Sequence, residues 1–313
     1  MAGFVVQRIA YGLAVLFAVT SLVFGLIHLS GDPLAALVPP GSSPEQTAKL
    51  RAHFGLDRPV AVQYATFISN AIQGDFGDSW RARRPALETV LDRLPATLAL
   101  TGAAIALALA LGIPLGIAAG SRPGGAVDLA ATGLALLGQA VPGFWLGTLL
   151  ILFFAVRLHW LPSSGGDGVR AIVLPALTLA AYPAATITRL LRSSLIETLS
   201  GDYIRTARGK GLSPWAVVRG HALRNAALPT LAFVGLQVGF LLGGAVVVEG
   251  VFAYPGIGQL ALQSVASRDL PVVQAFVVVV AALIVVVGFA TEALARWIDP
   301  RLRLADGPSR GNW

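Results

Sequence analysis

Six long stretches without a charged residue stand out along the chain and predict helices that cross a membrane. A helix needs about 20 apolar residues to span the bilayer core, and a charge at its centre costs roughly 2.5–3.5 kcal/mol. Charge-free runs of 18 to 28 residues lie between Arg8 and Asp32, Arg93 and Arg122, Asp128 and Arg157, Arg170 and Arg189, Arg224 and Glu249, and Asp269 and Glu292. The sequence therefore predicts an all-α polytopic membrane protein with six transmembrane helices.

These runs divide the chain into parts with defined bounds. The N-terminus and first span occupy 1–29, a long loop with short helices 30–93, a core 94–300 and a tail 301–313. Within the core we expect spans at 94–121, 129–156, 171–190, 229–249 and 270–293, with loops at 191–228 and 250–269. The first run is longer than the 7–15-residue apolar region of a signal peptide, so we interpret it as a membrane helix.

A seventh charge-free run, 250–267, is of a different kind. It contains Pro255, Gly256 and Gly258, which favour a turn followed by a short interfacial helix. A span at this position would also place the arginines of the C-terminal tail outside the cell. We therefore do not count it as a span.

Basic residues gather on one side of the predicted membrane. With six spans both termini lie on the same side, and that side carries 13 basic and 6 acidic residues, whereas the other side carries 10 of each. The positive-inside rule makes the basic side the cytoplasm. The loops at 30–93 and 250–269 are then external, and the loop at 191–228 and both termini are cytoplasmic. The net charge of +7 reports this topology, so we do not interpret it as a sign of nucleic-acid binding.

Both long loops contain start and stop signals of short helices. In the external loop, Ser43 precedes Pro44 as a helix cap, and a second helix follows Pro59 before residues 74–77 interrupt it. We expect a small folded cap on the outer face, although a solvated loop is an equal alternative for residues 30–58.

In the cytoplasmic loop, Asp202 is expected to cap a helix that Gly209 and Gly211 close, and Ser213 with Pro214 is expected to start another. The second helix carries three large apolar residues, which are Trp215, Val217 and Val218. Such residues either lie on lipid headgroups or dock a cytoplasmic partner, and the residues alone do not decide between the two.

Prolines and glycines interrupt several of the predicted spans. We expect breaks at Pro114, at Pro142 and Gly143, and at Pro175 and Pro183. Broken membrane helices are tolerated where they line a cavity, which favours a transport pathway slightly over the general abundance of these residues in membranes.

Polar residues within the spans are uncharged, which disfavours a proton-coupled carrier. Gln139 and Gln237, together with the break at Pro142 and Gly143, are our hypothesis for residues that line the pathway. The alternative is that such polar groups tie helices together.

Composition and motifs exclude several classes of function. Hydrophobic residues make up 55% of the chain and charged residues 12%, against about 25% charged in soluble domains, which disfavours an ordinary cytosolic enzyme and excludes a disordered chain. The chain has no cysteine and no G-x-x-x-x-G-K-[ST], H-E-x-x-H or G-x-S-x-G motif. Its four histidines are scattered without metal-ligand spacing. We expect no catalytic, cofactor or metal site in this chain, and no ATP hydrolysis by it.

Eight short motifs, in order along the chain, resemble the permeases of ABC importers, and more narrowly the first permease of the dipeptide/oligopeptide/nickel group. They are Gly31-Asp32-Pro33, FGLDRP at 54–59, GDFG at 74–77, RLPAT at 93–97, DYIRTARGKGL at 202–212, HALRNAALP at 221–229, VFAYPGIG at 251–258 and DLP at 269–271. The general coupling motif of these permeases begins Glu-Ala-Ala, whereas Arg205, Thr206 and Ala207 stand here with Gly211 retained, and the spacing from Gly211 to Pro229 is longer. Both departures are usual in the peptide group.

The resemblance implies a type I ABC importer permease fold and a set of partners. The permease would pair with a homologous second permease, two cytoplasmic ATPases that bind ATP and Mg²⁺, and an extracytoplasmic peptide-binding protein that docks on the external loop. A short helix around 207–213 would sit in a groove of one ATPase. The residues that carry the ATPase coupling would be Asp202, Tyr203, Arg205, Thr206, Ala207, Gly211, Leu212 and Ser213.

On this resemblance the protein imports di- or oligopeptides, with nickel, glutathione or an opine as alternative solutes. A stand-alone channel or secondary carrier is disfavoured by the elaborate cytoplasmic loop and the lack of buried charge. A membrane enzyme would need a catalytic pair inside the spans, and we identify none.

Overall fold

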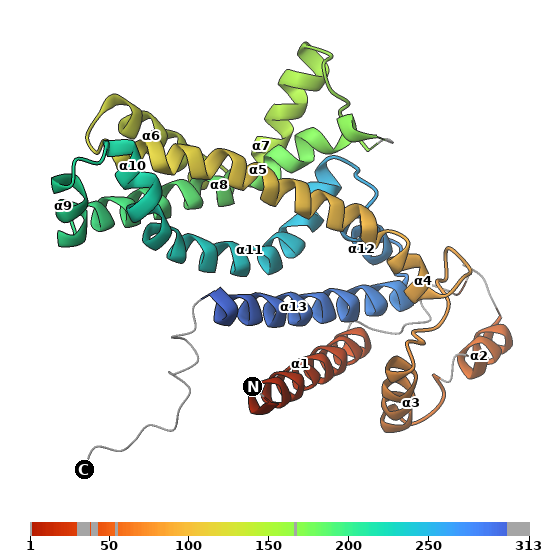
Figure 1. Cartoon of the computed structure of the whole chain (residues 1–313). Coiled ribbons are helices and arrows are strands. Elements are labelled where there is room, and N and C mark those ends of the chain that lie inside the picture. Colours follow the sequence, from red (N-terminus) through yellow and green to blue (C-terminus); the bar gives the residue numbers. More distant parts are fainter. Residues whose placement is uncertain (1, 30–37, 39–42, 54–55, 166–167, 299–313) are drawn as a thin grey trace. The chain divides into compact units, whose positions relative to one another are not determined.

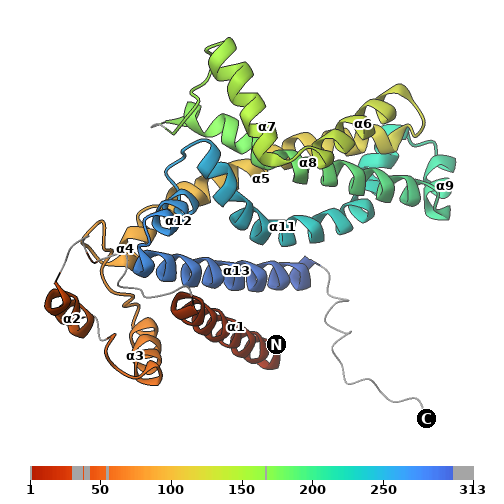
Figure 2. The same ribbon diagram turned by 180° about the vertical axis from the view of Figure 1, so that it is seen from behind.

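The computed structural model describes residues 2–29, 38, 43–53, 56–165 and 168–298, and almost all of these residues are helical (Figures 1 and 2). The only strand-like pairing among them is an isolated antiparallel bridge between Asp78 and Pro85. The chain forms two compact units, which are described separately. Unit 1 comprises Met1–Thr97 and Pro255–Val286, and unit 2 comprises Leu98–Tyr254 and Val287–Trp313. The motif at 31–33, the first two residues of the motif at 54–59 and the tail 301–313 lie outside the described residues.

Unit 1 contains the first helix, the short helices of the external loop and most of the last long helix. Its elements are α1 (Ala2–Leu29), α2 (Pro44–His53), α3 (Val60–Ile72), α4 (Ala86–Leu91), α12 (Ile257–Ala266) and the larger part of α13 (Leu270–Ile298). Ser43 caps α2 as predicted, because its hydroxyl accepts from the Gln46 N–H at 3.2 Å. Helix α12 is the short helix that was expected in the run 250–267.

The core of unit 1 joins the external loop to the start of α13. Its buried side chains are Phe76, Ala86, Val90, Ile257, Val272 and Ala275. Helix α3 packs on α1 through aromatic and polar contacts. The Tyr64 and Ser21 hydroxyls are 2.6 Å apart, and the Phe24 ring lies 5.5 Å from that of Phe67. The described part of the external loop is therefore folded, as expected for a cap.

Asp269 clamps the external loop to the N-terminus of α13. Its carboxylate is buried and accepts hydrogen bonds from the Ser79 hydroxyl at 2.6 Å, the Trp80 N–H at 3.1 Å and the Arg81 N–H at 3.3 Å. These contacts give the DLP motif at 269–271 a physical role, since one carboxylate satisfies three donors that lie about 190 residues away in the sequence.

We predict that Asp269→Ala loosens this loop, because the buried Ser79 hydroxyl and two partly buried backbone N–H groups lose their acceptor, and an unsatisfied buried donor is costly. Trypsin should then cleave faster at the exposed Arg81, Arg83 and Arg84 in right-side-out membrane vesicles. The matched control is Asp75→Ala, which removes an exposed carboxylate that accepts only from the Gly77 N–H at 2.8 Å. Equal cleavage rates in the two variants would contradict the clamp.

Unit 2 contains most of the remaining long helices. Its elements are α5 (Leu94–Ser121, apart from its first turn), α6 (Ala126–Ala140), α7 (Gly143–Leu150), the π-helix η2 (Ile151–Arg157), α8 (Val169–Leu199), α9 (Asp202–Gly209), α10 (Pro214–Val217), the π-helix η3 (Val218–Ala222) and α11 (Leu223–Val251). Helix α8 is the most buried of the long apolar helices and packs between α6 and α11 (Figures 1 and 2).

By length and composition, the described residues contain five helices that are able to cross a membrane. The stretch from α6 through α7 and η2 makes a sixth if it is one broken span, since its halves meet at an angle of 106°. This bend lies at Pro142 and Gly143, where the sequence predicts a break. Proline lacks the N–H that would continue the helix, and the Pro142 backbone is extended (ψ 134°).

Three other expected breaks are wrong. Helix α5 continues through Pro114, and α8 continues through both Pro175 and Pro183. Proline is tolerated inside membrane helices where surrounding groups satisfy the freed carbonyl, so a missing hydrogen bond need not end the helix. Helix α8 also continues to Leu199, nine residues beyond the predicted span, and α11 begins at Leu223, six residues before Pro229.

Candidate functional site

The loop that the sequence predicts to be cytoplasmic folds onto the ends of the long helices of unit 2. Its buried side chains are Leu191 and Leu195 of α8, Ile204 and Ala207 of α9, Val217 and Val218 from α10 and η3, and Ala222 and Ala226 at the start of α11. We call residues 202–218 the elbow. Because the elbow shares a core with α8 and α11, a force applied to it is transmitted directly to two long helices.

Helix α9 is amphipathic, with one face buried and the other exposed. Ile204 and Ala207 point into the shared core, whereas Arg205 and Thr206 are exposed. Asp202 is not the cap that the sequence predicts. Gly201 occupies the N-cap position without a side-chain bond, and Asp202 lies in the first turn, where its charge suits the helix dipole. The exposed ion pair from Arg205 to Asp202, at 3.1 Å, adds little stability.

A tight turn around Gly211 joins α9 to α10. Gly211 has φ +79°, a left-handed conformation that side chains with a Cβ resist, and no atom lies within 4 Å of where its Cβ would be. Ser213 caps α10 as predicted, since its hydroxyl accepts from the Ala216 N–H at 3.3 Å. The short helix expected around 207–213 lies earlier in the chain, because α9 ends at Gly209 and residues 210–213 form the turn before α10.

The exposed surface of the elbow combines apolar side chains with positive charge. Tyr203, Leu212 and Trp215 are 46%, 39% and 60% exposed. The cations on this surface are Arg205, Arg208 and Lys210, all of them exposed. Val217 and Val218, which the sequence groups with Trp215, are instead buried in the core of the elbow. Exposed aromatic residues beside cations are typical of a protein–protein interface.

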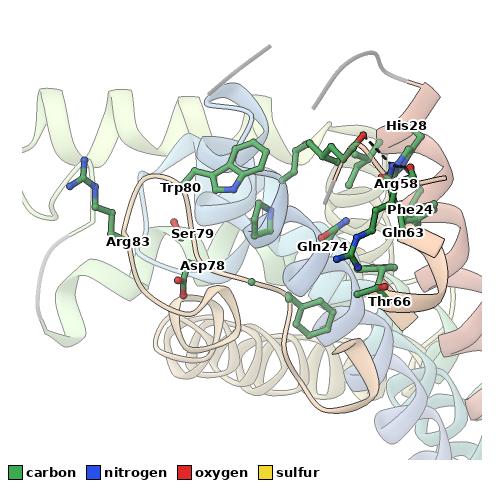
Figure 3. Close-up of a pocket in the computed structure, with 17 residues that line it drawn as sticks. Phe24, His28, Arg58, Gln63, Thr66, Asp78, Ser79, Trp80, Arg83 and Gln274 are labelled. Atoms are coloured by element: carbon green, nitrogen blue, oxygen red, sulfur yellow. Dashed lines mark hydrogen bonds between the residues drawn. The ribbon is translucent and has the colours of Figure 1, made fainter. Parts of the chain in front are cut away.

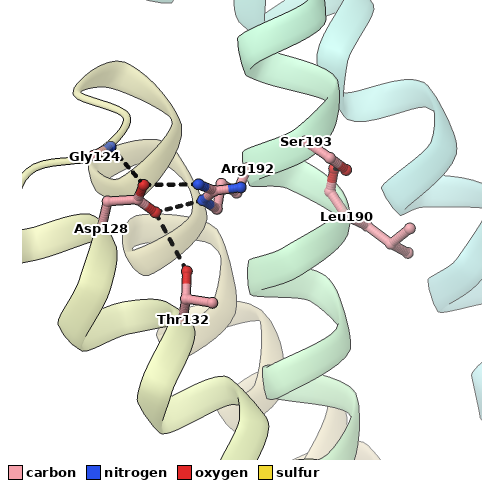
Figure 4. Close-up of polar contacts among 6 residues, drawn as sticks. All are labelled: Gly124, Asp128, Thr132, Leu190, Arg192 and Ser193. Carbon is pink, nitrogen blue, oxygen red and sulfur yellow. Dashed lines mark hydrogen bonds and ion pairs between the residues drawn. The ribbon is translucent and has the colours of Figure 1, made fainter.

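A buried ion pair that sequence reasoning missed ties α6 to α8 next to the elbow (Figure 4). Asp128 is 96% buried by its side chain and binds Arg192 through two hydrogen bonds, one from Nε and one from Nη2 at 2.7 Å. The Gly124 N–H donates to the same carboxylate at 2.8 Å and the Thr132 hydroxyl at 3.3 Å. In the sequence, the spacing of Gly124, Asp128 and Thr132 by four residues could have indicated the local contacts of Asp128. Nothing in the sequence indicated that Arg192 is its ionic partner.

The residues predicted to line a pathway lie in different surroundings. Gln139 bridges α6 and α8, since its Nε2 donates to the Thr186 hydroxyl at 2.9 Å and its Oε1 accepts from Arg189. Pro142 and Gly143 are exposed at the bend, and Gln237 is buried within unit 2. Among the described residues, no hydrogen bond joins Gln139 to the other three, and the role of all four in a pathway stays a prediction.

The outer end of α11 carries a buried carboxylate. Glu249 lies at the end of the expected fifth span and has no exposed surface, and the Tyr254 N–H donates to its carbonyl at 2.9 Å. Burial, and then the charge of Glu249, raise the pKa of the Tyr254 phenol above its usual range.

A cavity of about 580 Å³ opens in unit 1 at the outer end of α1 (Figure 3). Its size falls in the range of small-molecule sites. His28 lines it and is fixed by Gln63, with 3.1 Å between Nε2 and Oε1, while Arg58, Trp80 and Gln274 line other parts of it. Within the described part of the chain, no three His, Cys, Asp or Glu residues gather as metal ligands.

Solved structures with a similar fold are ABC transporters. The inward-facing MetNI methionine ABC transporter aligns with a TM-score of 0.57 and 22% identity over 67% of this chain and 96% of that chain. An amino acid ABC transporter with histidines aligns with a TM-score of 0.52 and 18% identity over 68% of this chain and 94% of that chain. The fold is therefore that of an ABC importer permease, as the sequence motifs predict.

Sequence relatives identify the family. Residues 112–304 match the inner membrane component of binding-protein-dependent transport systems, and residues 1–101 match the N-terminal region of such components. The glutathione transport system permease protein GsiC of Escherichia coli K12 is 40% identical over 304 residues, which are 97% of this chain and 99% of the relative. The GsiC of Shigella flexneri serotype 5b gives the same values. The chain belongs to this family of inner membrane components and is the permease of a binding-protein-dependent ABC importer.

Proposed function

We propose that the protein forms half of the translocation pathway for short peptides. The observation that carries this proposal is the elbow, whose exposed surface of apolar and basic side chains fits a docking partner, on a chain whose relatives are named for transport of glutathione. Glutathione, the solute named for GsiC, is a tripeptide, so it is the particular solute that the comparison favours.

In this proposal the chain is not catalytic, and ATP and Mg²⁺ bind to two separate cytoplasmic ATPases. The elbow docks on one of them through Tyr203, Leu212 and Trp215, and its cations steer the approach. Closure of the ATPases then moves the elbow, and with it α8 and α11, whose side chains share its core. A homologous second permease supplies the other half of the pathway.

The proposed orientation places both termini in the cytoplasm and the external loop outside. The charge balance supports this orientation, since 13 of the 23 basic residues lie on the proposed cytoplasmic side with only 6 of the 16 acidic residues. The folded cap of α2, α3 and α4 would then receive the peptide-binding protein. Docking of such a protein on the external side would explain why this loop is folded.

The test is uptake by proteoliposomes that contain the assembled complex, its binding protein and internal ATP. We expect ATP-dependent accumulation of a radiolabelled di- or tripeptide, with competition by excess glutathione. Excess nickel, added as the competitor in place of glutathione, should not reduce uptake of the peptide. Accumulation that persists without ATP, or with this chain alone, would support a stand-alone carrier and contradict the proposal.

A further inference from the structure

One face of α8 is polar where every neighbouring long helix is apolar. Between residues 171 and 195, the exposed side chains of α8 are Tyr182, Arg189 and Ser193, and Thr186 lies half-buried between them. These positions follow one another at helical spacing and form a single stripe. By contrast, the exposed positions of α5 from 98 to 118 and of α11 from 228 to 247 are all apolar or glycine.

The stripe needs an explanation, because polar side chains on a membrane helix face a water-filled cavity or another polar group rather than lipid. Helix α8 rises about 28 Å from Arg170 to Arg189, roughly the thickness of the bilayer core. Tyr182 therefore lies at membrane depth, and Arg189 lies near the inner end of the core. A solute that crosses the membrane along this face meets Arg189 as it leaves.

Arg189 differs from its neighbour Arg192 in having no carboxylate partner in the described residues. The Arg192 guanidinium is neutralised by Asp128, whereas the Arg189 guanidinium donates to the neutral Oε1 of Gln139. Gln139 is itself fixed by Thr186, whose hydroxyl donates to the Tyr182 carbonyl at 3.1 Å. One edge of the guanidinium is thus held in place, while its remaining N–H donors have no hydrogen-bond partner among the described residues and can bind an anion.

We propose that Arg189, oriented by Gln139, is a binding site for the carboxylate of the transported solute at the inner end of the pathway. This inference rests on the proposed function, because peptides and glutathione carry carboxylates at neutral pH. Arginine suits the role because its planar fork binds a carboxylate through two parallel hydrogen bonds. Gln139 acts as a positioning residue and does not touch the solute.

The test compares a dipeptide with its C-terminal amide in proteoliposomes of the full complex. Because all variants share one binding protein, a changed ratio of the two uptake rates reports on the permease. We expect Arg189→Gln to lower uptake of the free acid about tenfold and to leave uptake of the amide unchanged, and Arg189→Lys to lose less. Gln139→Ala should raise the KM for the free acid with little change in kcat. The control Arg170→Gln removes an exposed arginine from the outer end of the same helix and should leave the ratio unchanged.

An unchanged ratio in Arg189→Gln, or an equal loss for both peptides, would contradict the site and indicate a residue that reaches lipid headgroups or the second permease. If the wild-type complex takes up neither peptide, the proposed function fails by itself. In that case, thiol labelling in this cysteine-free chain tests whether the polar face of α8 is reached by water. A hydrophilic reagent should modify Tyr182→Cys and spare Leu236→Cys, which is 68% exposed on the apolar face of α11. Equal protection of both cysteines would overturn the inference.

Discussion

Replacing Gly211 by valine is expected to abolish most ATP-driven uptake while the protein still inserts into the membrane. Gly211 holds the turn between α9 and α10 at φ +79°, where a residue with a Cβ loses roughly 1–2 kcal/mol and a β-branched residue loses more. A turn that relaxes away from this conformation moves Leu212 and Trp215. We expect the affinity of the elbow for the ATPase, and with it uptake, to fall about tenfold.

Two further variants separate backbone conformation from side-chain bulk. Gly211→Asn should retain more uptake than Gly211→Val, because asparagine tolerates the left-handed region. Gly209→Val adds the same side chain two residues earlier, where space is also open and the backbone is helical, and should lose less. Normal uptake by Gly211→Val, measured with the complex at equal expression, would contradict the assignment of this turn to coupling.

Breaking the ion pair between Asp128 and Arg192 should give the largest loss of stability of any single substitution of a charged side chain. Asp128→Asn keeps the shape of the side chain but leaves Arg192 without its counter-charge at a site where Asp128 is buried. An ionic partner left alone in a buried site is strongly destabilising. We expect the thermal unfolding midpoint of the purified complex to fall by several degrees.

The matched control is Lys49→Ala, which breaks the exposed ion pair from Lys49 to Glu45 at 2.9 Å in α2. Exposed pairs of this kind contribute little, so the midpoint should stay where it is. If Asp128→Asn melts at the wild-type temperature, the pair is not what joins α6 to α8. A further loss of elbow docking in Asp128→Asn is expected, since Arg192 lies on α8 between Leu191 and Leu195, two residues of the elbow's core.

Much of the fold was predictable because membrane helices appear in the sequence as runs without charged residues. The second span was predicted at 94–121, and α5 occupies Leu94–Ser121. The caps at Ser43 and Ser213 were also predictable, since each serine precedes a proline at the first helical position. What these signals share is that they act within a few residues of the chain.

The rest depends on contacts between distant residues and was not predictable in this way. The prolines at 114, 175 and 183 predict breaks in the helices, but α5 and α8 each continue through them as single helices. Val217 was grouped with Trp215 on one surface, although the fold buries the first and exposes the second. The ion pair between Asp128 and Arg192 joins residues 64 positions apart, and no sequence pattern around either residue predicts this pairing.

The measurement that tests the central claim most directly is crosslinking from a single cysteine in this naturally cysteine-free chain. Thr206→Cys places a thiol on the exposed face of α9, and Ile72→Cys places one on α3, where the side chain is 82% exposed. After crosslinking in native membranes, mass spectrometry should identify a P-loop ATPase on Thr206→Cys and no ATPase on Ile72→Cys. An ATPase on neither cysteine, or on Ile72→Cys alone, would contradict a cytoplasmic elbow that couples this permease to ATP hydrolysis.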